Sequence, residues 1–439
     1  MKRGTPYFGA AYYPEAWPTG TMEKEIPLMK RAGMNVVRLA EFSWIQMEPR
    51  PGAFDLAWLR NVIDRLAEAG IASILCTPSA TPPVWLTKEH PEILFVDDTG
   101  QPRQHGERCH WCPSQPVYRE HVARIVEAMA REFGRHPSVV GWQIDNEPYP
   151  NRRGCCCPVC VAKFRQQLRQ RFGTIENLNQ TWGTNLWSQR YESFDDFDVP
   201  RSTIWHHPSL VAEWMRFQSD SYVEHVAMQA ELLRRHTDRP IGTDTMPMHR
   251  LNYRDLEKYL DVLQFNHYPS LGELRSSQFW MSYVQSFKDR PFWVTESSPG
   301  ASAATAVTKR KGYKPENFVR VLSWLPIMMG AEAQLYWLWR CHWSGQELMH
   351  GSVVDSCGRP SFSFSEVAEV GTGLARAAEF LNNTRPAKPH VALHFSCDTA
   401  LMFEGQRLID GFQYEDYYLQ HGKGRGELVE AFYEPLAKA

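Results

Sequence analysis

Short apolar runs alternate with amphipathic stretches along most of this chain. A run such as NVVRLA (35–40) is apolar enough for burial on both faces, as strands of a parallel sheet are. The stretch that follows it, 55–69, places apolar residues at helical spacing. The apolar runs predict strands at 7–13, 35–40, 71–78, 139–146, 241–246, 262–269, 292–297 and 331–339.

The amphipathic stretches between these runs predict the helices. They lie at 22–33, 55–69, 116–133, 209–235, 252–260, 272–288, 315–329 and 364–381. Eight strands alternating with helices favour an α/β fold of the (β/α)8 TIM-barrel type. A doubly wound sheet is the alternative, but no G-x-G-x-x-G or Walker-type loop follows the first strand, which disfavours it.

Two connections are unusually long, and they suggest where the barrel carries its chemistry. Segments 79–115 and 147–208 leave the carboxyl ends of the third and fourth strands, the end at which TIM barrels build active sites. The barrel is expected to occupy residues 1–385. Residues 386–439 are then a short, incomplete α/β segment of a second domain, or a tail. They contain a predicted strand (391–396) and a closing helix in GELVEAFYEPLAKA.

Charge and composition exclude several classes of protein. The net charge is −2 and the basic residues are scattered, so neither nucleic acid nor an anionic membrane surface is an expected partner. No segment approaches 18 apolar residues, and the N-terminus lacks the apolar stretch of a signal peptide. The ten cysteines are therefore interpreted as thiols in a reducing compartment, and the predicted location is the cytoplasm.

Two glutamates follow predicted strands on opposite sides of the barrel mouth. Asn146 and Glu147, in GWQIDNEPYP, end the fourth strand, and Glu296, in FWVTESSPG, ends the seventh. Retaining glycoside hydrolysis needs one carboxylic acid and one carboxylate about 5–5.5 Å apart. Asn146 is suited to bind a sugar 2-hydroxyl. The simpler interpretation is that each glutamate only pairs with an arginine at a strand end.

Several motifs resemble one family of glycosidases. AAYYPEAWP, NVVRLAEFSW, GWQIDNEP, TESSPG and HWSGQELMHG resemble segments of the bacterial β-galactosidases of glycoside hydrolase family 42, and the resemblance covers about residues 5–385. It implies retaining cleavage of terminal non-reducing β-D-galactosides. In the matching positions, Glu147 is the general acid/base and Glu296 is the nucleophile.

The resemblance also implies sugar-binding residues. Arg108 and Asn146 match sugar-binding partners of the two carboxylates. Tyr268, in NHYP, matches a tyrosine beside the nucleophile, and Trp187, in NLWSQRY, matches a tryptophan of the sugar platform.

Two further residues match the pair that reads the galactose 4- and 6-hydroxyls. They are Glu347 and His350, in G-Q-E-x-x-H. A histidine in such a loop is often only a local hydrogen-bond partner. Arg38, at the end of the second strand, is another candidate from its position, either for substrate or for a salt bridge inside the barrel.

One stretch departs from the family pattern. A tryptophan usually stands about eight residues beyond the nucleophile, but here the stretch reads ASAATAV, with Ala303 and Ala304. A stacking surface for the sugar is then missing or supplied from elsewhere, which puts the sugar and the linkage in doubt. β-D-Fucosides and α-L-arabinopyranosides, which share the galactose ring configuration, are the alternative substrates.

A cysteine-rich stretch offers a metal site. GCCCPVC (154–160) contains a C-x-C-x-x-C run, which together with one distant cysteine suits a structural zinc site of four cysteines. Cys109 and Cys156 could replace members of the set, and metal-free thiols are the alternative. The resemblance implies zinc on Cys112, Cys155, Cys157 and Cys160, where it would connect the two long loops.

Two other classes of function compete with the glycosidase. A zinc hydrolase is disfavoured because the dense ligand cluster is all cysteine, with no H-E-x-x-H motif. A non-catalytic sugar-binding barrel would require the loss of a carboxylate, and both are present. Since family members commonly form trimers through their second domain, the resemblance also raises a homotrimer as one assembly to expect.

Overall fold

The chain forms the predicted barrel of parallel strands. The computed structural model describes residues 4–106, 108–150, 153–201, 204, 206–246, 251–287, 290–300, 315–348, 350–387, 389–396, 398 and 427–438. Its strands are β1 (Tyr7–Ala11), β2 (Val36–Leu39), β3 (Ala72–Cys76), β4 (Val139–Gln143), β5 (Ile241–Gly242), β6 (Asp244–Thr245), β7 (Gln264–Asn266), β8 (Trp293–Glu296) and β9 (Ala333–Tyr336).

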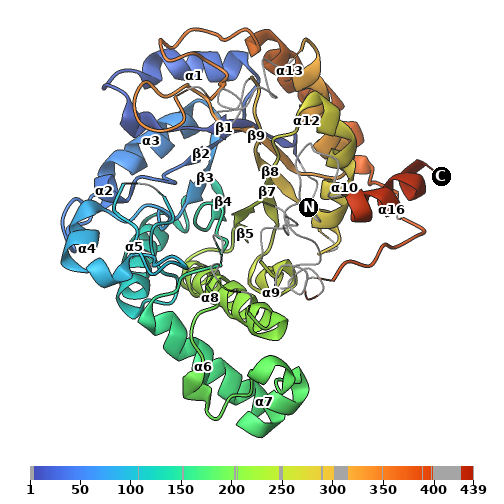
Figure 1. Cartoon of the computed structure of the whole chain (residues 1–439). Coiled ribbons are helices and arrows are strands. Elements are labelled where there is room, and N and C mark those ends of the chain that lie inside the picture. The colour runs from blue at the N-terminus through green and yellow to red at the C-terminus, as the bar shows by residue number, and fades with distance from the viewer. Residues whose placement is uncertain are drawn as a thin grey trace.

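The strand order confirms a barrel rather than a doubly wound sheet. Hydrogen bonding follows β5-β4-β3-β2-β1-β9-β8-β7-β6, and every pairing is parallel. The two ends of this order, β5 and β6, are consecutive in the chain and separated by Thr243. They are the two halves of the predicted fifth strand, so the ring closes through one interrupted strand (Figure 1).

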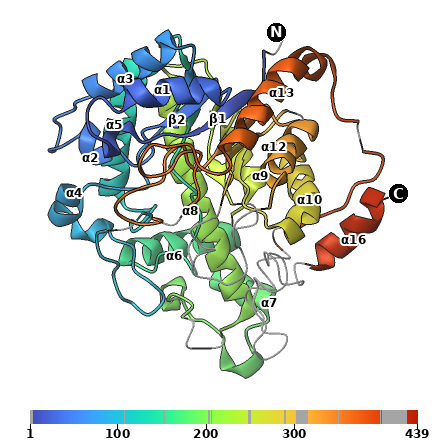
Figure 2. The same cartoon turned by 90° about the horizontal axis from the view of Figure 1, so that it is seen from above.

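Helices surround the strands, as the amphipathic stretches predict (Figures 1 and 2). Those matching the predicted ranges are α1 (Met22–Arg31), α3 (Ala57–Glu68), α5 (Pro116–Phe133), α8 (Pro208–Arg234), α9 (Tyr253–Leu256) with η5 (Glu257–Tyr259), α10 (Leu274–Gln285), α12 (Phe318–Met328) and α13 (Phe364–Asn383). In α3, Leu59, Val62, Ile63 and Leu66 form one buried stripe, and each such side chain contributes about 1.5–3 kcal/mol.

The loops between these elements add further helices. These are η1 (Pro14–Ala16), α2 (Trp44–Met47), α4 (Val84–Glu89), η2 (Pro91–Ile93), α6 (Pro158–Phe172), α7 (Ile175–Trp182), η3 (Leu186–Ser188), η4 (Phe194–Asp196) and η6 (Leu271–Glu273). Figure 1 shows α6 and α7 extending away from the barrel beyond α8. Among the described residues, no helix has the length and apolar content required to cross a membrane.

The barrel interior changes from apolar to polar along its axis. Val36, Ile74, Trp293 and Leu335 pack together inside it. Because side chains alternate along a strand, Arg38 lies on the same inner face as Val36, two residues nearer the carboxyl end of β2. The apolar layer therefore forms a floor beneath the polar residues at the carboxyl ends of the strands.

The C-terminal segment corrects one prediction and confirms another. Residues 391–396 form no strand: they are mostly exposed, and no described segment pairs with them, whereas a strand requires a hydrogen-bonding neighbour. The closing helix is present as α16 (Glu427–Lys438), which packs on α10 through the rings of Tyr433 and Phe279, 5.3 Å apart (Figure 2). Assignment of 386–439 to a second domain stays a prediction.

Candidate active site

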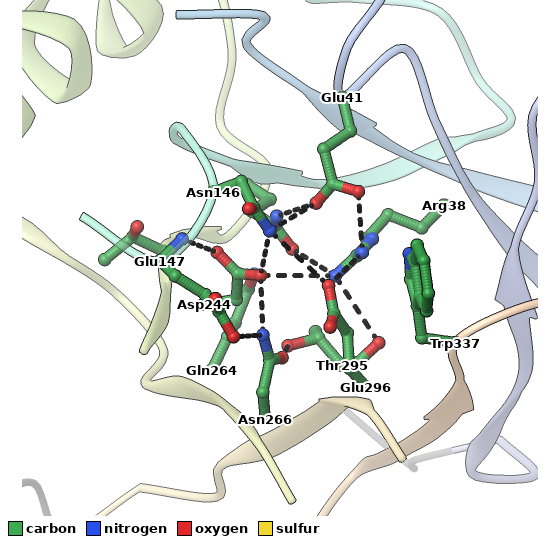
Figure 3. A network of polar contacts seen from close by, with 12 residues as sticks. Arg38, Glu41, Asn146, Glu147, Asp244, Gln264, Asn266, Thr295, Glu296 and Trp337 are labelled. Atoms are coloured by element: carbon green, nitrogen blue, oxygen red, sulfur yellow. Dashed lines mark hydrogen bonds and ion pairs between the residues drawn. The ribbon is translucent and has the colours of Figure 1, made fainter. Parts of the chain in front are cut away.

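The two predicted catalytic glutamates both lie at the carboxyl end of the barrel. Glu296 is the last residue of β8, as predicted. Strand β4 ends at Gln143, three residues earlier than predicted, and Glu147 stands in the turn beyond it. Figure 3 shows both side chains in one network of polar contacts at the centre of the mouth.

Donors from three separate elements surround the Glu296 carboxylate. Arg38 donates to its Oε1 and forms an ion pair with it. The Tyr268 hydroxyl donates to Oε2 at 2.5 Å, and Asn146 Nδ2 lies 3.5 Å from Oε1. Burial raises the pKa of Tyr268, and the charge of Glu296 raises it further, so the hydroxyl stays protonated and donates. The carboxylate is thereby fixed in one orientation.

Arg38 also joins two other buried carboxylates to Glu296. Its guanidinium lies 2.8 Å from Glu41 and 3.4 Å from Asp244 (Figure 3). Burial raises the pKa of Glu41 to about 7 and that of Asp244 well above its ordinary value, although Arg38 opposes both shifts. The oxygens of Glu41, Asp244 and Glu296 are close enough to surround a metal ion. The Arg38 guanidinium, however, already supplies the positive charge among them.

Glu147 has different surroundings. Its Oε1 accepts from Asn266 Nδ2 at 2.8 Å, and Arg108 pairs with Oε2 at 3.1 Å. Burial raises the pKa of Glu147; Arg108 lowers it, and the nearby Glu296 carboxylate raises it again. A carboxyl group whose pKa is raised toward neutrality can be protonated at working pH, which suits a general acid.

Asn146 lies between the two glutamates. Its Nδ2 is 3.1 Å from Asp244 Oδ2 and 3.2 Å from Glu41 Oε1, and its Oδ1 accepts from Arg108. The predicted partners Arg108 and Asn146 are therefore both brought to the carboxylates, and Arg38 forms the salt bridge inside the barrel that was one of its two predicted roles.

Of the predicted pair in the G-Q-E-x-x-H stretch, His350 lies beside Tyr268, the residue that donates to Glu296. His350 is buried, with its ring edge-on to Trp337 at 4.4 Å and to Tyr268 at 5.7 Å. Glu347 lies on the open side of the mouth, where desolvation of its carboxyl group raises its pKa, Arg108 lowers it, and Glu296 raises it further. The role of both residues in binding sugar hydroxyls stays a prediction.

Two predictions are less closely tied to this geometry. Trp187 lies in η3, in the loop beyond α7, and its side chain is 70% exposed, so its role as a sugar platform stays a prediction. Ala303 and Ala304, at the place of the expected tryptophan, lie outside the described residues.

Several site residues were missed by the sequence interpretation. They are Tyr13, Glu41, Asp244, Asn266 and Trp337, each in or just beyond the carboxyl end of a strand. A search for polar or aromatic residues at the carboxyl end of every predicted strand would have found them, because these ends meet around one mouth.

The cysteine cluster forms as predicted. Cys112 Sγ lies 3.6 Å from Cys157 Sγ and 3.4 Å from Cys160 Sγ, and the four sulfurs, including that of Cys155, lie within 4.8 Å of one another in buried positions. Four thiolates around zinc at about 2.3 Å would be roughly 3.8 Å apart, so the set fits that ion.

The two spare cysteines lie outside this cluster. Cys109 Sγ points to the Asn146 carbonyl oxygen at 3.8 Å, and Cys156 Sγ points to the Gly154 carbonyl oxygen at 3.6 Å. The structure therefore favours the ligand set that the family resemblance implies over the sets containing either spare thiol.

The sequence profile of a family described as β-galactosidase, glycoside hydrolase family 42, matches residues 11–377. The chain belongs to this family. It is 34% identical to β-galactosidase YesZ from Bacillus licheniformis over 440 residues, which cover 99% of this chain and 64% of that protein. It is 35% identical to β-galactosidase Bga from Halorubrum lacusprofundi, with coverage of 96% and 63%.

A solved β-galactosidase structure shares the fold. The crystal structure of the β-galactosidase from Rahnella sp. R3 superposes with a TM-score of 0.89 at 28% identity, covering 94% of this chain and 62% of that one. The chain thus spans a little under two thirds of the length of these relatives.

Proposed function

We propose that the chain is a retaining glycoside hydrolase that cleaves terminal non-reducing β-D-galactosides. The observation that carries this proposal is the contrast between the two glutamates at the barrel mouth. Glu296 receives hydrogen bonds from Arg38, Tyr268 and Asn146. Glu147 instead contacts Asn266 and Arg108, and burial raises its pKa. Such a contrast assigns one carboxylate to nucleophilic attack and the other to proton transfer.

In the first step, a Glu296 oxygen attacks the anomeric carbon, and the bond to the leaving oxygen breaks. Glu147 gives its proton to that oxygen, so the aglycone departs as a neutral alcohol and a glycosyl ester forms on Glu296. Tyr268 and Arg38, which contact the two oxygens of Glu296, orient the carboxylate for attack.

In the second step, Glu147 is ionised and acts as a base. It takes a proton from a water molecule, the water oxygen attacks the anomeric carbon, and the ester bond to Glu296 breaks. Arg108 favours the ionised form of Glu147 that this step requires. Two inversions leave the product with the configuration of the substrate.

The family and two residues of the G-Q-E-x-x-H stretch support the proposed substrate class. Glu347 offers an acceptor for a sugar hydroxyl, and His350, packed on Trp337 and Tyr268, offers a ring nitrogen. We assign them to the 4- and 6-hydroxyls. β-D-Fucosides and α-L-arabinopyranosides, which differ from galactosides at carbon six, are the alternative substrates.

A panel of aryl glycosides followed by ¹H NMR tests this proposal. We expect the full chain to hydrolyse the β-D-galactoside faster than the β-D-fucoside or the α-L-arabinopyranoside, and to release the β-anomer of the sugar first. Initial release of the α-anomer would contradict a retaining mechanism. Binding of all three sugars without cleavage would instead favour a non-catalytic sugar-binding barrel.

We also propose a structural zinc ion on Cys112, Cys155, Cys157 and Cys160. Four thiolates complete the tetrahedron and leave no position for water, so the ion would take no part in the chemistry. Its ligands come from both long loops, 79–115 and 147–208. Zinc would therefore fix the loop that bears Arg108 relative to the one that bears Glu147.

We also propose a cellular location and an assembly. None of the nine described cysteines forms a disulfide, which suits a reducing compartment, and we propose the cytoplasm. A homotrimer remains the assembly suggested by the family.

A further inference from the structure

The turn that carries the acid/base glutamate has an unusual backbone. Asp145 and Glu147 have φ angles of 59° and 48°, in the left-handed region. This conformation costs roughly 1–2 kcal/mol for a residue other than glycine, and Asp tolerates it better than Glu does. The surrounding structure must therefore stabilise the turn for Glu147 to keep its place.

Side chains bind all three backbone amides of this turn. The N–H of Asp145 donates to Thr77 Oγ1 at 2.9 Å, and that of Asn146 donates to Asp145 Oδ1 at 2.7 Å. The N–H of Glu147 donates to Asp244 Oδ1 at 2.9 Å. The direction of the Glu147 side chain consequently depends on three specific side-chain acceptors.

The Asp145 carboxylate is itself contacted by side chains from other parts of the fold. Its Oδ2 contacts the Ser79 hydroxyl and lies 3.2 Å from His225 Nε2, and the side chains of Asp145 and His225 are fully buried. The His225 ring packs against Trp111, with centroids 4.6 Å apart. Burial lowers the pKa of His225, so its neutral form prevails at neutral pH.

These contacts connect the turn to rigid parts of the fold. Thr77 and Ser79 follow β3, and His225 lies in the middle of α8. Gln229, one helical turn beyond His225, accepts from Thr77 Oγ1 at 2.6 Å and so closes the network. None of these groups carries out a step of the mechanism proposed above.

We propose that Thr77, Asp145 and His225 are positioning residues for Glu147. They act on the acid/base through the backbone of residues 145–147, whereas the Glu147 oxygens themselves contact Asn266 and Arg108. The inference rests on the proposed function, and it adds the residues that set the direction of its acid.

A displaced acid has a characteristic kinetic signature. Departure of a poor leaving group, such as phenol, needs protonation by Glu147, whereas 2,4-dinitrophenol departs without it. General acid catalysis contributes about 10²–10⁴-fold to the rate. A variant that misplaces Glu147 should therefore lose activity on phenyl β-D-galactoside and retain it on the dinitrophenyl glycoside.

The test measures kcat/KM of full-chain variants on both galactosides, per active site titrated with a 2-fluoro galactoside. Asp145→Ala removes the carboxylate, and Thr77→Val removes one hydroxyl while keeping the side-chain shape. Asp145→Asn keeps an oxygen for the Asn146 N–H and tolerates a left-handed backbone. Ser323→Ala is the control, since it deletes a buried hydroxyl that bonds Tyr336 in the outer layer.

We expect Asp145→Ala and Thr77→Val to lose at least about tenfold more activity on the phenyl than on the dinitrophenyl galactoside, a fraction of the acid's contribution. Asp145→Asn should fall between Asp145→Ala and the wild type, and Ser323→Ala should show no preference. If Asp145→Ala does not fold, the losses of Thr77→Val on the two galactosides test the positioning role in its place.

The two hypotheses fail in different ways. Equal losses on both galactosides, in variants measured beside an active wild type, would overturn the positioning role and leave the proposed function standing. A wild type that cleaves neither galactoside would overturn the proposed function, and the positioning role with it.

Discussion

At the scale of single residues, two side chains of the same type acquire different chemistry from their neighbours. Glu296 contacts Arg38 and Tyr268, which fix its orientation. Glu147 is partly buried with Arg108 as its cationic partner, and desolvation raises its pKa more than the arginine lowers it. The assignment of nucleophile and acid thus depends on these contacts rather than on the glutamates themselves.

Arg108→Met tests the electrostatic part of this assignment. The arginine lowers the pKa of Glu147, so its removal should raise that pKa and keep the acid protonated to higher pH. We therefore expect the alkaline limb of the kcat/KM profile to move upward. Arg60→Met, which removes an exposed arginine of α3 paired with Glu132, should leave the limb in place. A downward shift in Arg108→Met would contradict the account.

The sequence reveals some of these residues and conceals others for a physical reason. Glu147 and Glu296 could be predicted because each follows an apolar run that is visible as a strand. Glu41 and Asp244 could be found as polar residues near strand ends, but their pairing with Arg38 could not, since Asp244 is 206 residues away from Arg38 in the chain. Pairing of carboxylates around one guanidinium depends on barrel closure, which no local pattern encodes.

At the scale of elements, the two long loops behave as one unit. Segments around Val96 and Cys156 are joined by a backbone hydrogen bond of 2.8 Å, and the cysteine cluster lies beside it. Phe164 and Trp214, from α6 and α8, pack in the same apolar cluster as the cysteines. The position of Arg108 relative to Glu147 is therefore expected to depend on this junction.

Cys157→Ser and Cys156→Ser form a matched pair that tests the proposed zinc site. Elemental analysis should find about one zinc per wild-type chain, little in Cys157→Ser and an unchanged amount in Cys156→Ser. Cys157→Ser should also have a lower Tm and a lower kcat/KM, because the loops lose their connection. A wild type without zinc, or equal zinc in the two variants, would remove the assignment of the four cysteines as ligands.

At the scale of the whole molecule, the barrel supports the site by packing its own interior. Gly141 in β4 lets the indole of Trp293 fill the floor: a Cβ added there would come within 2.6 Å of the ring. Alternation of strands and helices was sufficient to predict this architecture. The same kind of pattern predicted a strand at 391–396. That prediction was wrong, because this apolar run has no neighbouring strand among the described residues.

Gly141→Ala tests the packing of the floor. Overpacking a closed interior should lower the free energy of unfolding by about 1–3 kcal/mol, seen as a lower midpoint in urea denaturation. Gly4→Ala is the matched control, since a Cβ there meets nothing within 4 Å. Equal urea midpoints for the two variants would contradict this prediction, because they would mean that the apolar floor accommodates the added methyl group without loss of stability.

The most direct test of the central claim is azide rescue of Glu296→Ala with an activated aryl β-D-galactoside. We expect the substitution to lower kcat on the order of 10⁶-fold, the size of effect that removal of a catalytic nucleophile produces. Azide should then restore turnover and yield α-galactosyl azide, because it attacks from the face that Glu296 leaves empty. Undiminished hydrolysis in Glu296→Ala, or a β-galactosyl azide product, would contradict the assignment of Glu296 as the nucleophile.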